Sequence, residues 1–321
     1  MTETQTPRGV LICPMPADKD AMHAAFLAQS GDRRVYLYPE LAAPDAPMAE
    51  QIGCIVAFRP PRDIFASLPH LRLLHGTGAG VNHMLAVPDL PRHLPMARVV
   101  ADEVTQGMAQ HCLHALLREL RDHRTYDRLQ REKVWKRLPQ RDAGTWPVGI
   151  MGLGALGMGL ADVALRLGFA VRGWSRGEKS VPGVATFAGR DSLPDFLAGL
   201  SALVVLLPLT PETTGIVGAA ELAAMAPGAV VVSAARGGQV IEADLIAALD
   251  SGHLSHAHLD VMATEPLPPE SPLWTHPAIT VTPHIAAAPN GPALARLVLE
   301  NFARLEAGAP LLFPVDLTLG Y

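Results

Sequence analysis

The chain has 321 residues, of which 49% are hydrophobic and 18% charged, and its formal net charge is −5. This length is enough for two domains of ordinary size, and the composition is typical of a globular protein rather than a disordered one. The small negative charge gives no reason to expect nucleic acid or an anionic membrane as a partner.

The cysteines and the amino terminus predict a soluble cytoplasmic protein. Cys13, Cys54 and Cys112 are odd in number and lack CxxC spacing, which is typical of buried, reduced thiols. The first ten residues, "MTETQTPRGV", contain no apolar core of the kind that signal peptides have. The sequence also lacks an apolar run of the roughly 18 residues needed to cross a bilayer.

The first third of the chain alternates short apolar runs with helical patterns, which predicts a parallel α/β fold. Buried strands are expected at 8–14, 54–58 and 71–76. A helical segment is expected from Asp102 to about Arg131. Its apolar positions recur at spacings of three and four, which gives one buried face made of Val104, Met108, Cys112, Ala115 and Leu116.

A second series begins near residue 148 and contains six apolar runs that predict the strands of a complete doubly wound dinucleotide-binding fold. These runs are 148–152, 170–175, 202–209, 229–235, 256–261 and 279–285. Helices are expected at 155–167 and 242–249. A last helix at 292–305 follows the completed sheet, so we expect it to pack on the amino-terminal unit. The predicted domains are therefore residues 1–100 with 287–321, and residues 101–286.

A glycine-rich turn, "GLGALG", follows the first strand of the second series. Gly152, Gly154 and Gly157 form the pattern GxGxxG, and a helix begins at Ala155 and Leu156. The first glycine permits a tight turn, the second lets the backbone approach a pyrophosphate, and the third lets helix and strand pack closely. Amides at the start of that helix would face the phosphates. The turn predicts a bound dinucleotide.

The next strand ends in Trp174-Ser175-Arg176, without the acidic residue that commonly reads an adenosine ribose. Ser175 removes the repulsion that a carboxylate would exert on a 2′-phosphate. Arg176 can donate two parallel hydrogen bonds to such a phosphate, and Lys179 adds positive charge nearby. The sequence therefore predicts a preference for NADPH, with NADH as a possible second cofactor.

Three later segments each place one polar residue just after a strand, where ligands bind in this fold. These residues are Arg236, Glu265 and His284. An arginine binds a carboxylate through a planar fork. A histidine titrates near neutral pH and can act as an acid, and a hydrogen-bonded glutamate can orient it and favour its charged form. Together they predict the reduction of a 2-oxo acid.

The motifs "GLGALG", "LLPLTPETTG", "SAARGGQV", "LDVMATEPLP" and "TPHIAA" resemble, in order, those of the NAD(P)-dependent D-2-hydroxyacid dehydrogenases. Within that family the segments "WSRGEKSVPGV" and "EADLIAALDSGHL" are most similar to the glyoxylate/hydroxypyruvate reductase A branch. The resemblance covers about residues 70–310. It implies two Rossmann-like domains with the active site between them, and a homodimer formed largely by the cofactor domains.

The resemblance also implies roles for individual residues. Arg236 would bind the substrate, Glu265 would tune His284, and His284 would donate the proton. The segment "GTGAGVNH" resembles the family's substrate loop, in which Ala79 and Gly80 would bind the substrate carboxylate. Residues implied along the cofactor are Pro208, Thr213 and Ala234, with Asp260 near the nicotinamide carboxamide. Phe58 stands where many relatives have Trp, and this difference bears on the width of the substrate pocket.

The reaction predicted in this way is reduction of glyoxylate or hydroxypyruvate. Two alternatives stay open: a bulkier or phosphorylated substrate on the same fold, and a dinucleotide-sensing protein with incidental activity. No metal is predicted, because His111 and His114 lack a carboxylate or cysteine partner. His253, His256 and His258 are interpreted as surface or packing residues. Trp135 and Trp146 are interpreted as core or dimer-interface residues.

Overall fold

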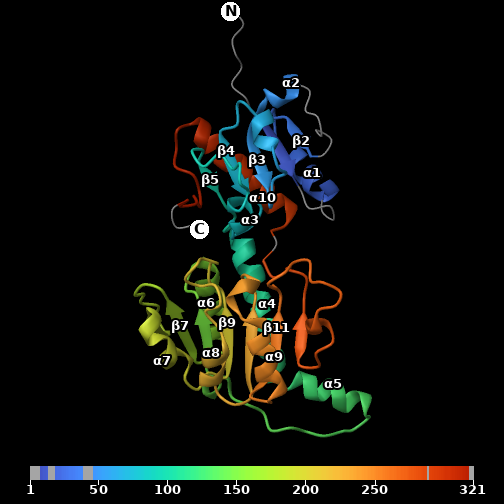
Figure 1. The fold of residues 1–321 in the computed structure, drawn as a ribbon, viewed down its shortest axis with the longest axis vertical. Helices are drawn as coiled ribbons and strands as arrows, with labels where there is room; N and C mark the ends of the chain where they lie inside the picture. Colours follow the sequence, from blue (N-terminus) through green and yellow to red (C-terminus); the bar gives the residue numbers. More distant parts are fainter. Residues whose placement is uncertain (1–7, 14–18, 39–45, 288, 318–321) are drawn as a thin grey trace, which may run out of the picture. The chain divides into compact units, whose positions relative to one another are not determined.

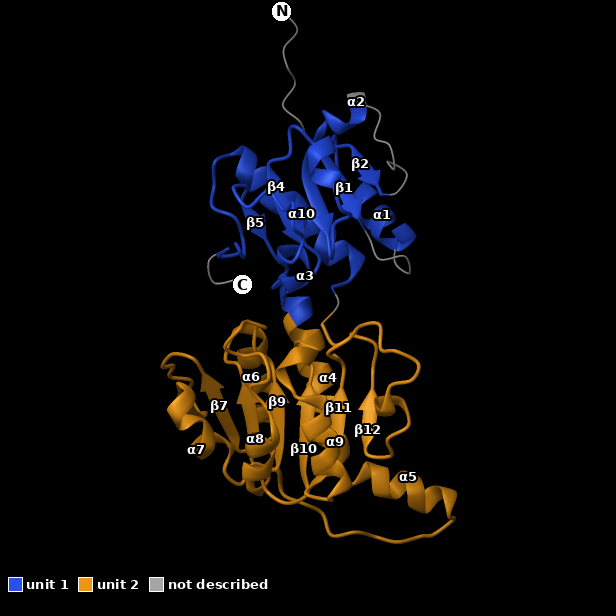
Figure 2. Ribbon diagram, viewed as in Figure 1, with its two compact units in different colours: residues 1–104, 288–321 blue, residues 105–287 orange. Residues whose placement is uncertain are grey.

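The computed structural model describes residues 8–13, 19–38, 46–287 and 289–317. The chain divides into two compact units, one made of residues 1–104 and 288–321 and the other of residues 105–287 (Figure 2). The division near residue 104 lies inside a long helix, and the expected boundary at residue 100 lies just before that helix.

Unit 1 contains a five-stranded parallel sheet with strand order β2-β1-β3-β4-β5 (Figure 1). Its strands are β1 (Gly9–Cys13), β2 (Val35–Leu37), β3 (Ile52–Ala57), β4 (Leu73–Gly76) and β5 (Met96–Ala97). Its helices are α1 (Lys19–Leu27), α2 (Ala46–Ala49), α3 (Asn82–Leu85) and α10 (Gly291–Glu306), with a 3₁₀ turn at Ile64–Ser67. Three of the strands were predicted, whereas β2 and β5 are too short to give an apolar run.

The last helix, α10, packs on α1 and β4 of unit 1. Asn290 caps it by accepting a hydrogen bond from the amide of Ala293 at 2.8 Å, and the next residues are Gly291 and Pro292. A Cβ on Gly291 would lie 3.1 Å from the Cβ of Ala25, so the two helices meet closely at this point. The helix expected at 292–305 is confirmed.

A buried polar pair joins α10 to the end of β4. His75 is fully buried, its Nδ1 lies 2.8 Å from the carbonyl of Gly76, and its Nε2 lies 3.1 Å from the Nδ2 of Asn301. Asn301 also accepts a hydrogen bond from the amide of Leu312 at 2.7 Å. Burial lowers the pKa of His75 to about 4, so the ring is neutral and suits these two uncharged partners. The pair fixes the point where the chain leaves β4.

Unit 2 contains a seven-stranded parallel sheet with strand order β12-β11-β10-β9-β6-β7-β8 (Figure 1). Its strands are β6 (Val148–Met151), β7 (Val171–Ser175), β8 (Ala185–Ala188), β9 (Ala202–Val205), β10 (Ala229–Ser233), β11 (Leu254–Leu259) and β12 (Ile279–Val281). The six expected strands are present. The seventh, β8, lies at the edge, and its sequence "ATFA" lacks a strong apolar pattern.

The helices of unit 2 cover both faces of this sheet. They are α4 (Asp102–Leu120), which begins in unit 1, α5 (His123–Arg131), α6 (Ala155–Arg166), α7 (Leu193–Leu197), α8 (Ala219–Ala224) and α9 (Glu242–Asp250). Short 3₁₀ turns occur at Ala143–Thr145, Arg190–Ser192, Gly237–Gln239 and Pro272–Trp274. Alternate strand residues contribute to two separate apolar cores: Leu203 and Val205 belong to one, and Ala202 and Val204 to the other.

The segment from Asp102 to Arg131 is two helices rather than one. Asp122 has a φ of 55° and ends the first helical run, so α5 begins at His123. The predicted apolar face of α4 is confirmed, because Val104, Met108, Cys112, Ala115 and Leu116 are all buried. The apolar periodicity therefore marked the buried face correctly, but it gave no sign of the turn.

Candidate active site

The glycine turn after β6 has the geometry that a dinucleotide requires. Gly152 has a φ of 114°, and a Cβ on it would lie 2.7 Å from the carbonyl oxygen of Leu206. A Cβ on Gly157 would lie 1.8 Å from the carbonyl oxygen of Gly152, so helix α6 can pack here only with glycine. In contrast, no described atom lies within 4 Å of the Cβ position of Gly154. The turn is thus closed toward the protein and open where a pyrophosphate would approach.

Helix α6 begins at Ala155 with Gly154 as its N-cap, and both residues are exposed while Leu156 is half-buried. No cap side chain satisfies the first amides of this helix. These amides and the positive end of the helix dipole are therefore available to an anion at the turn.

The end of β7 provides the residues predicted to read the adenosine ribose. Ser175 is buried, and its hydroxyl donates a hydrogen bond to the carbonyl of Gly177 at 2.8 Å. The Nζ of Lys179 donates to the carbonyl of Leu153 at 2.5 Å, so this ammonium lies over the glycine turn. Lys179 thereby anchors its own loop to the glycine turn, and the cofactor contacts of both residues stay predictions.

Arg176 faces the loop that follows β9. A hydrogen bond from Thr210 and the positive charge of Arg176 both lower the pKa of Glu212. Arg176 is itself exposed. The guanidinium is thus within electrostatic reach of that loop and remains accessible to an anionic ligand.

The loop after β9 is held by two polar side chains. The hydroxyl of Thr213 donates to the carbonyl of Pro208 at 2.7 Å. Gln239, which is fully buried, donates to the carbonyls of Leu207 and Pro208 at 2.7 and 3.1 Å. Pro208 and Thr213 were predicted from the motif "LLPLTPETTG", whereas Gln239 was not, because its position after "ARGG" is its only sequence signal.

Arg236 lies three residues after the end of β10, in a loop that begins at the buried Ala234. Its Nη1 donates to the carbonyl of Ala235 at 2.5 Å, while its buried Nε has no hydrogen-bond partner among the described residues. Burial lowers the pKa of the Arg236 guanidinium, and the negative charge of Glu265 acts in the opposite direction. Arg236 and Glu265 are therefore electrostatic neighbours.

Gly237 makes this proximity possible. A Cβ on Gly237 would lie 1.9 Å from the carbonyl carbon of Met262, so the Arg236 loop touches the backbone of the loop that carries Glu265. The latter loop is fixed at Met262, whose amide donates to Oε1 of Glu265 at 3.0 Å. At Ala263 the amide donates to Glu242 at 2.7 Å.

Glu265 and His284 form a hydrogen-bonded pair. The Nδ1 of His284 lies 2.7 Å from Oε2 of Glu265, and both side chains are only partly exposed. His284 has a φ of 55°, a left-handed conformation that costs a non-glycine residue about 1 kcal/mol. Since Nδ1 is bonded to the carboxylate, the ring is held in one orientation.

Asp260 supports the unusual backbone of His284. Its fully buried carboxylate accepts hydrogen bonds from the Thr282 hydroxyl at 2.6 Å and from the amides of Ile285 and Ala286, both at 2.9 Å. Its own carbonyl accepts from the amide of His284 at 2.8 Å. Oδ2 accepts only one of these bonds, so it retains capacity for one more donor. The expected contact of Asp260 with the nicotinamide carboxamide stays a prediction. Its hydrogen bonds to residues 282–286 could not be inferred from the sequence.

The predicted substrate loop belongs to unit 1 and follows β4. Its carbonyls are bonded: Gly78 accepts from the amide of Val99 at 3.0 Å, and Ala79 accepts from Nη1 of Arg98 at 3.2 Å. Within the described residues, the amides of Ala79 and Gly80 make no hydrogen bond. These two amides are therefore available to a ligand. The ring of Phe58 contacts that of His83, the last residue of this segment, with centroids 4.1 Å apart and planes tilted by 41°.

The fold of unit 2, its glycine turn and the Arg236–Glu265–His284 group define a dinucleotide-dependent dehydrogenase. Residues 113–286 match the family described as D-isomer specific 2-hydroxyacid dehydrogenase, NAD binding domain. The chain belongs to this family, as its motifs predicted. Among the described residues no helix is long and apolar enough to cross a membrane.

Three individual relatives are similar to this chain over most of their length. The chain is 39% identical to a glyoxylate/hydroxypyruvate reductase A of Serratia proteamaculans over 83% of this chain and 87% of the relative. It superposes with a TM-score of 0.91 on an NADPH-dependent glyoxylate/hydroxypyruvate reductase of Sinorhizobium meliloti in complex with NADP and sulfate, at 37% identity, covering 98% and 99% of the two chains. A D-isomer specific 2-hydroxyacid dehydrogenase of Xanthobacter autotrophicus in complex with NADPH and MES gives a TM-score of 0.90 at 40% identity, covering 98% and 100%.

The contact at Gly237 gives a test of how the site is assembled. Gly237→Ala should lower kcat/KM for a 2-oxo acid about 100-fold, because the added methyl separates the Arg236 loop from the Glu265 loop. The matched control is Gly238→Ala, since a Cβ there would meet only Leu209 at 3.6 Å, an ordinary contact. Steady-state kinetics of both variants provide the measurement. Equal activities in the two variants would contradict this account.

Proposed function

We propose that this protein reduces small 2-oxo acids, with glyoxylate and hydroxypyruvate as substrates and glycolate and D-glycerate as products, and that it prefers NADPH. The observation that carries the proposal is the 2.7 Å hydrogen bond between His284 and Glu265, beside the guanidinium of Arg236. The printed names of the relatives, which include glyoxylate/hydroxypyruvate reductases, support the same substrates.

The residues fit a dinucleotide. The open face at Gly154 and the free amides of α6 would bind the pyrophosphate, and Ser175, Arg176 and Lys179 would bind the ribose with its 2′-phosphate. Pro208, Thr213, Ala234 and Asp260 would lie along the rest of the cofactor. When bound, the reduced nicotinamide supplies a hydride for the carbonyl carbon of the substrate.

The protein's own groups would then bind the acid and provide the proton. Arg236 binds the substrate's carboxylate or carbonyl oxygen. Its buried Nε has no hydrogen-bond partner among the described residues, so it can donate to a substrate oxygen. The amides of Ala79 and Gly80 bind the carboxylate. His284, oriented by Glu265, gives its Nε2 proton to the carbonyl oxygen as that oxygen becomes an alkoxide.

Two rival readings remain distinguishable. A bulkier or phosphorylated 2-oxo acid would use the same groups. Phe58 stands where many relatives have the larger Trp, which would leave more room for such an acid. A dinucleotide-sensing protein would bind NADPH yet reduce every 2-oxo acid slowly. Initial rates with glyoxylate, hydroxypyruvate, pyruvate, a phenyl-substituted and a phosphorylated 2-oxo acid, each with NADPH and NADH, separate all three.

The proton-donor assignment predicts a specific pattern of loss. His284→Gln should lower kcat for glyoxylate about 10²–10⁴-fold, because a general acid is removed, with little change in NADPH affinity. In the unchanged protein reduction should slow as pH rises, since only the protonated ring can donate. Glu265→Gln should also lower kcat, because a neutral amide orients the ring less firmly than the carboxylate does.

The matched control for these variants is His276→Gln, because His276 also pairs with an acid, Asp250, at 3.2 Å in the same unit. Rates measured from pH 5 to 9, together with NADPH titration by fluorescence, give the answer. A reduction rate that does not depend on pH, or full activity in His284→Gln, would exclude this role for His284.

The cofactor assignment predicts that Ser175→Asp reverses the preference for NADPH. A carboxylate at this position repels a 2′-phosphate and can accept a hydrogen bond from a ribose hydroxyl, so the ratio of kcat/KM for NADPH to that for NADH should fall at least about tenfold. Ser175→Ala removes the same hydroxyl without adding charge and is the control. An unchanged ratio in Ser175→Asp would show that the 2′-phosphate is read elsewhere.

We also propose a homodimer in a reducing, cytoplasmic compartment. The three free thiols are all buried, which suits such a compartment. Trp146 is buried against Phe169, with ring centroids 6.1 Å apart, so core packing accounts for it. Trp135 is 98% exposed and adjoins Val134, which is 46% exposed, in the extended stretch after α5 (Figure 2). An apolar ring exposed to this degree is typical of an interface, and a second copy of the chain is the proposed partner.

The dimer proposal predicts that Trp135→Ser weakens self-association about tenfold or more, because large aromatic side chains dominate interface energies. Trp274→Ser is the control, since Trp274 is 52% exposed and lies on a different surface turn. Sedimentation equilibrium over a range of concentrations gives the dissociation constants. A monomeric unchanged protein would refute the dimer, and equal constants for the two variants would remove Trp135 from its interface.

A further inference from the structure

A buried group of three ionisable side chains lies away from the candidate active site. His256 and His258 are two residues apart on β11 and therefore share one face of the sheet, with ring centroids 4.7 Å apart. Glu119, near the end of α4, faces them, and its Oε1 lies 3.0 Å from Nε2 of His258. All three residues are buried, and one nitrogen or oxygen atom of each lies within 4.8 Å of those of the other two.

His256 is incompletely bonded in this environment. Its Nε2 lies 2.9 Å from the hydroxyl of Thr280, whereas its buried Nδ1 has no hydrogen-bond partner in the described part of the chain. Only 2% of the residue is exposed. A buried polar nitrogen without a partner is costly unless something else binds it.

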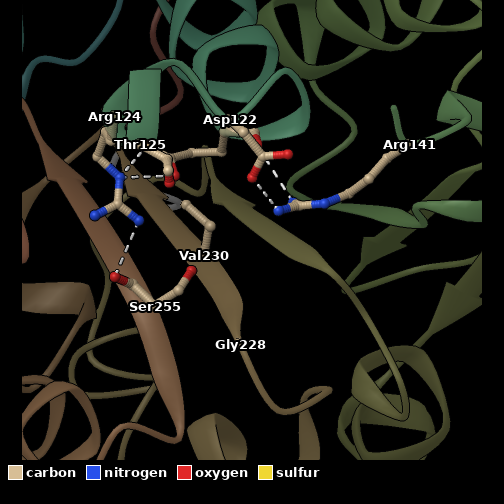
Figure 3. Close-up of a pocket in the computed structure, with 8 residues that line it drawn as sticks. Asp122, Arg124, Thr125, Arg141, Gly228, Val230 and Ser255 are labelled. Carbon is tan, nitrogen blue, oxygen red and sulfur yellow. Dashed lines mark hydrogen bonds and ion pairs between the residues drawn. The ribbon is translucent and has the colours of Figure 1, made fainter. Parts of the chain in front are cut away.

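A pocket of about 300 Å³ reaches this group from one side. Of the three side chains, Glu119 lines this pocket. Arg124, Ser255 and Val230 of β10 line it too (Figure 3). The Nε of Arg124 donates to both oxygens of Glu119 at 2.9 Å, and its Nη2 donates to the carbonyl of Ser255 at 3.2 Å. The pocket gives solvent and small ions a path to the Glu119 carboxylate, and room for water as a further ligand.

We propose that Glu119, His256 and His258 bind a divalent transition-metal ion of the zinc class. Two neutral imidazoles and one carboxylate are a donor set that zinc uses, with ligand distances of about 2.0–2.2 Å. Tetrahedral ligands at those distances lie about 3.3 Å apart. His258 and Glu119 already lie 3.0 Å apart, so they need to separate by only a few tenths of an ångström.

The metal takes the place of the proton shared between His258 and Glu119. A neutral His258 ring binds the ion through the lone pair of Nε2 when its single proton is on Nδ1, so the proton moves from Nε2 to Nδ1 and the ring stays neutral. His256 supplies the second nitrogen through its unbonded Nδ1 after a small shift of the ring, and water from the pocket completes the coordination. The negative charge of Glu119 is retained throughout.

Arg124 opposes this binding. Its positive charge adjoins the carboxylate, so the ion and the guanidinium compete for the same two oxygens. Arg118 is a second positive charge that acts on His256. These positive charges weaken the affinity of the site for a metal ion. Removal of the Arg124 charge should therefore strengthen metal binding.

The bound ion would join α4 to β11. Strand β11 leads directly into Asp260, so the ion would stabilise unit 2 without touching the reactants. This inference does not rest on the proposed reaction, and its readouts do not require activity.

The test uses the full-length, tag-free protein, stripped with a chelator and then titrated with Co²⁺. We expect one equivalent to produce the strong visible absorption of tetrahedral Co²⁺, to be displaced by Zn²⁺, and to raise the melting temperature. His256→Phe should weaken binding at least about tenfold. This variant removes an incompletely bonded imidazole, so it should fold, which circular dichroism checks.

Two further variants sharpen the result. Arg124→Gln should bind Co²⁺ about tenfold more tightly, since a repelling charge is removed. His253→Asn is the matched control, because His253 lies just before the same strand and its ring nitrogen Nε2 lies 3.0 Å from the carbonyl oxygen of Leu222. The proposal is overturned by unchanged binding in His256→Phe, or by the absence of the Co²⁺ spectrum in both the natural protein and Arg124→Gln.

Discussion

The buried carboxylate of Asp260 is the constraint on which the candidate site depends. A charge removed from water is costly unless several hydrogen bonds replace its hydration. Here a hydroxyl and two amides of residues 282–286 do so, and they can do so only if the chain turns sharply at His284. The left-handed conformation of His284 is thus a consequence of satisfying Asp260. In this conformation the ring of His284 reaches Glu265, with 2.7 Å between Nδ1 and Oε2.

Close backbone contacts serve the rest of the site. Gly157 and Gly237 lie where two segments approach so closely that a Cβ would overlap a peptide group, 1.8 Å from an oxygen in one case and 1.9 Å from a carbon in the other. The first contact sets the start of α6 against the glycine turn. The second sets the Arg236 loop against the Glu265 loop. Both the proposed phosphate site and the proposed reactive group therefore depend on residues that take no part in chemistry.

Much of this architecture was predictable because it follows from local patterns. The apolar runs of β6, β7, β9, β10, β11 and β12 are long enough to be recognised, and the polar residues that follow them lie at the same sheet edge by topology. Short or edge strands such as β2 and β8 contain too few apolar residues to be recognised as strands from the sequence. The turn at Asp122 breaks a helical pattern whose periodicity continues through it.

The contacts between distant segments were not predictable. Gln239 and Asp260 act through side-chain hydrogen bonds to backbone 25 to 32 residues away, and no spacing rule encodes such bonds. The interpretation of His256 and His258 as surface or packing residues was incomplete for the same reason. They are buried, and their partner Glu119 lies 139 residues from His258 in the sequence.

The proposed proton donor, its orienting acid, the arginine and the glycine turn all belong to the continuous stretch 105–287, whereas the loop with Ala79 and Gly80 belongs to the other unit. Substitutions in this proposed substrate loop, and at Phe58 in the same unit, can thus change how an acid is held while the proposed reactive group in the other unit is preserved. A modular division of this kind allows a lineage to acquire new acids as substrates without rebuilding its chemistry.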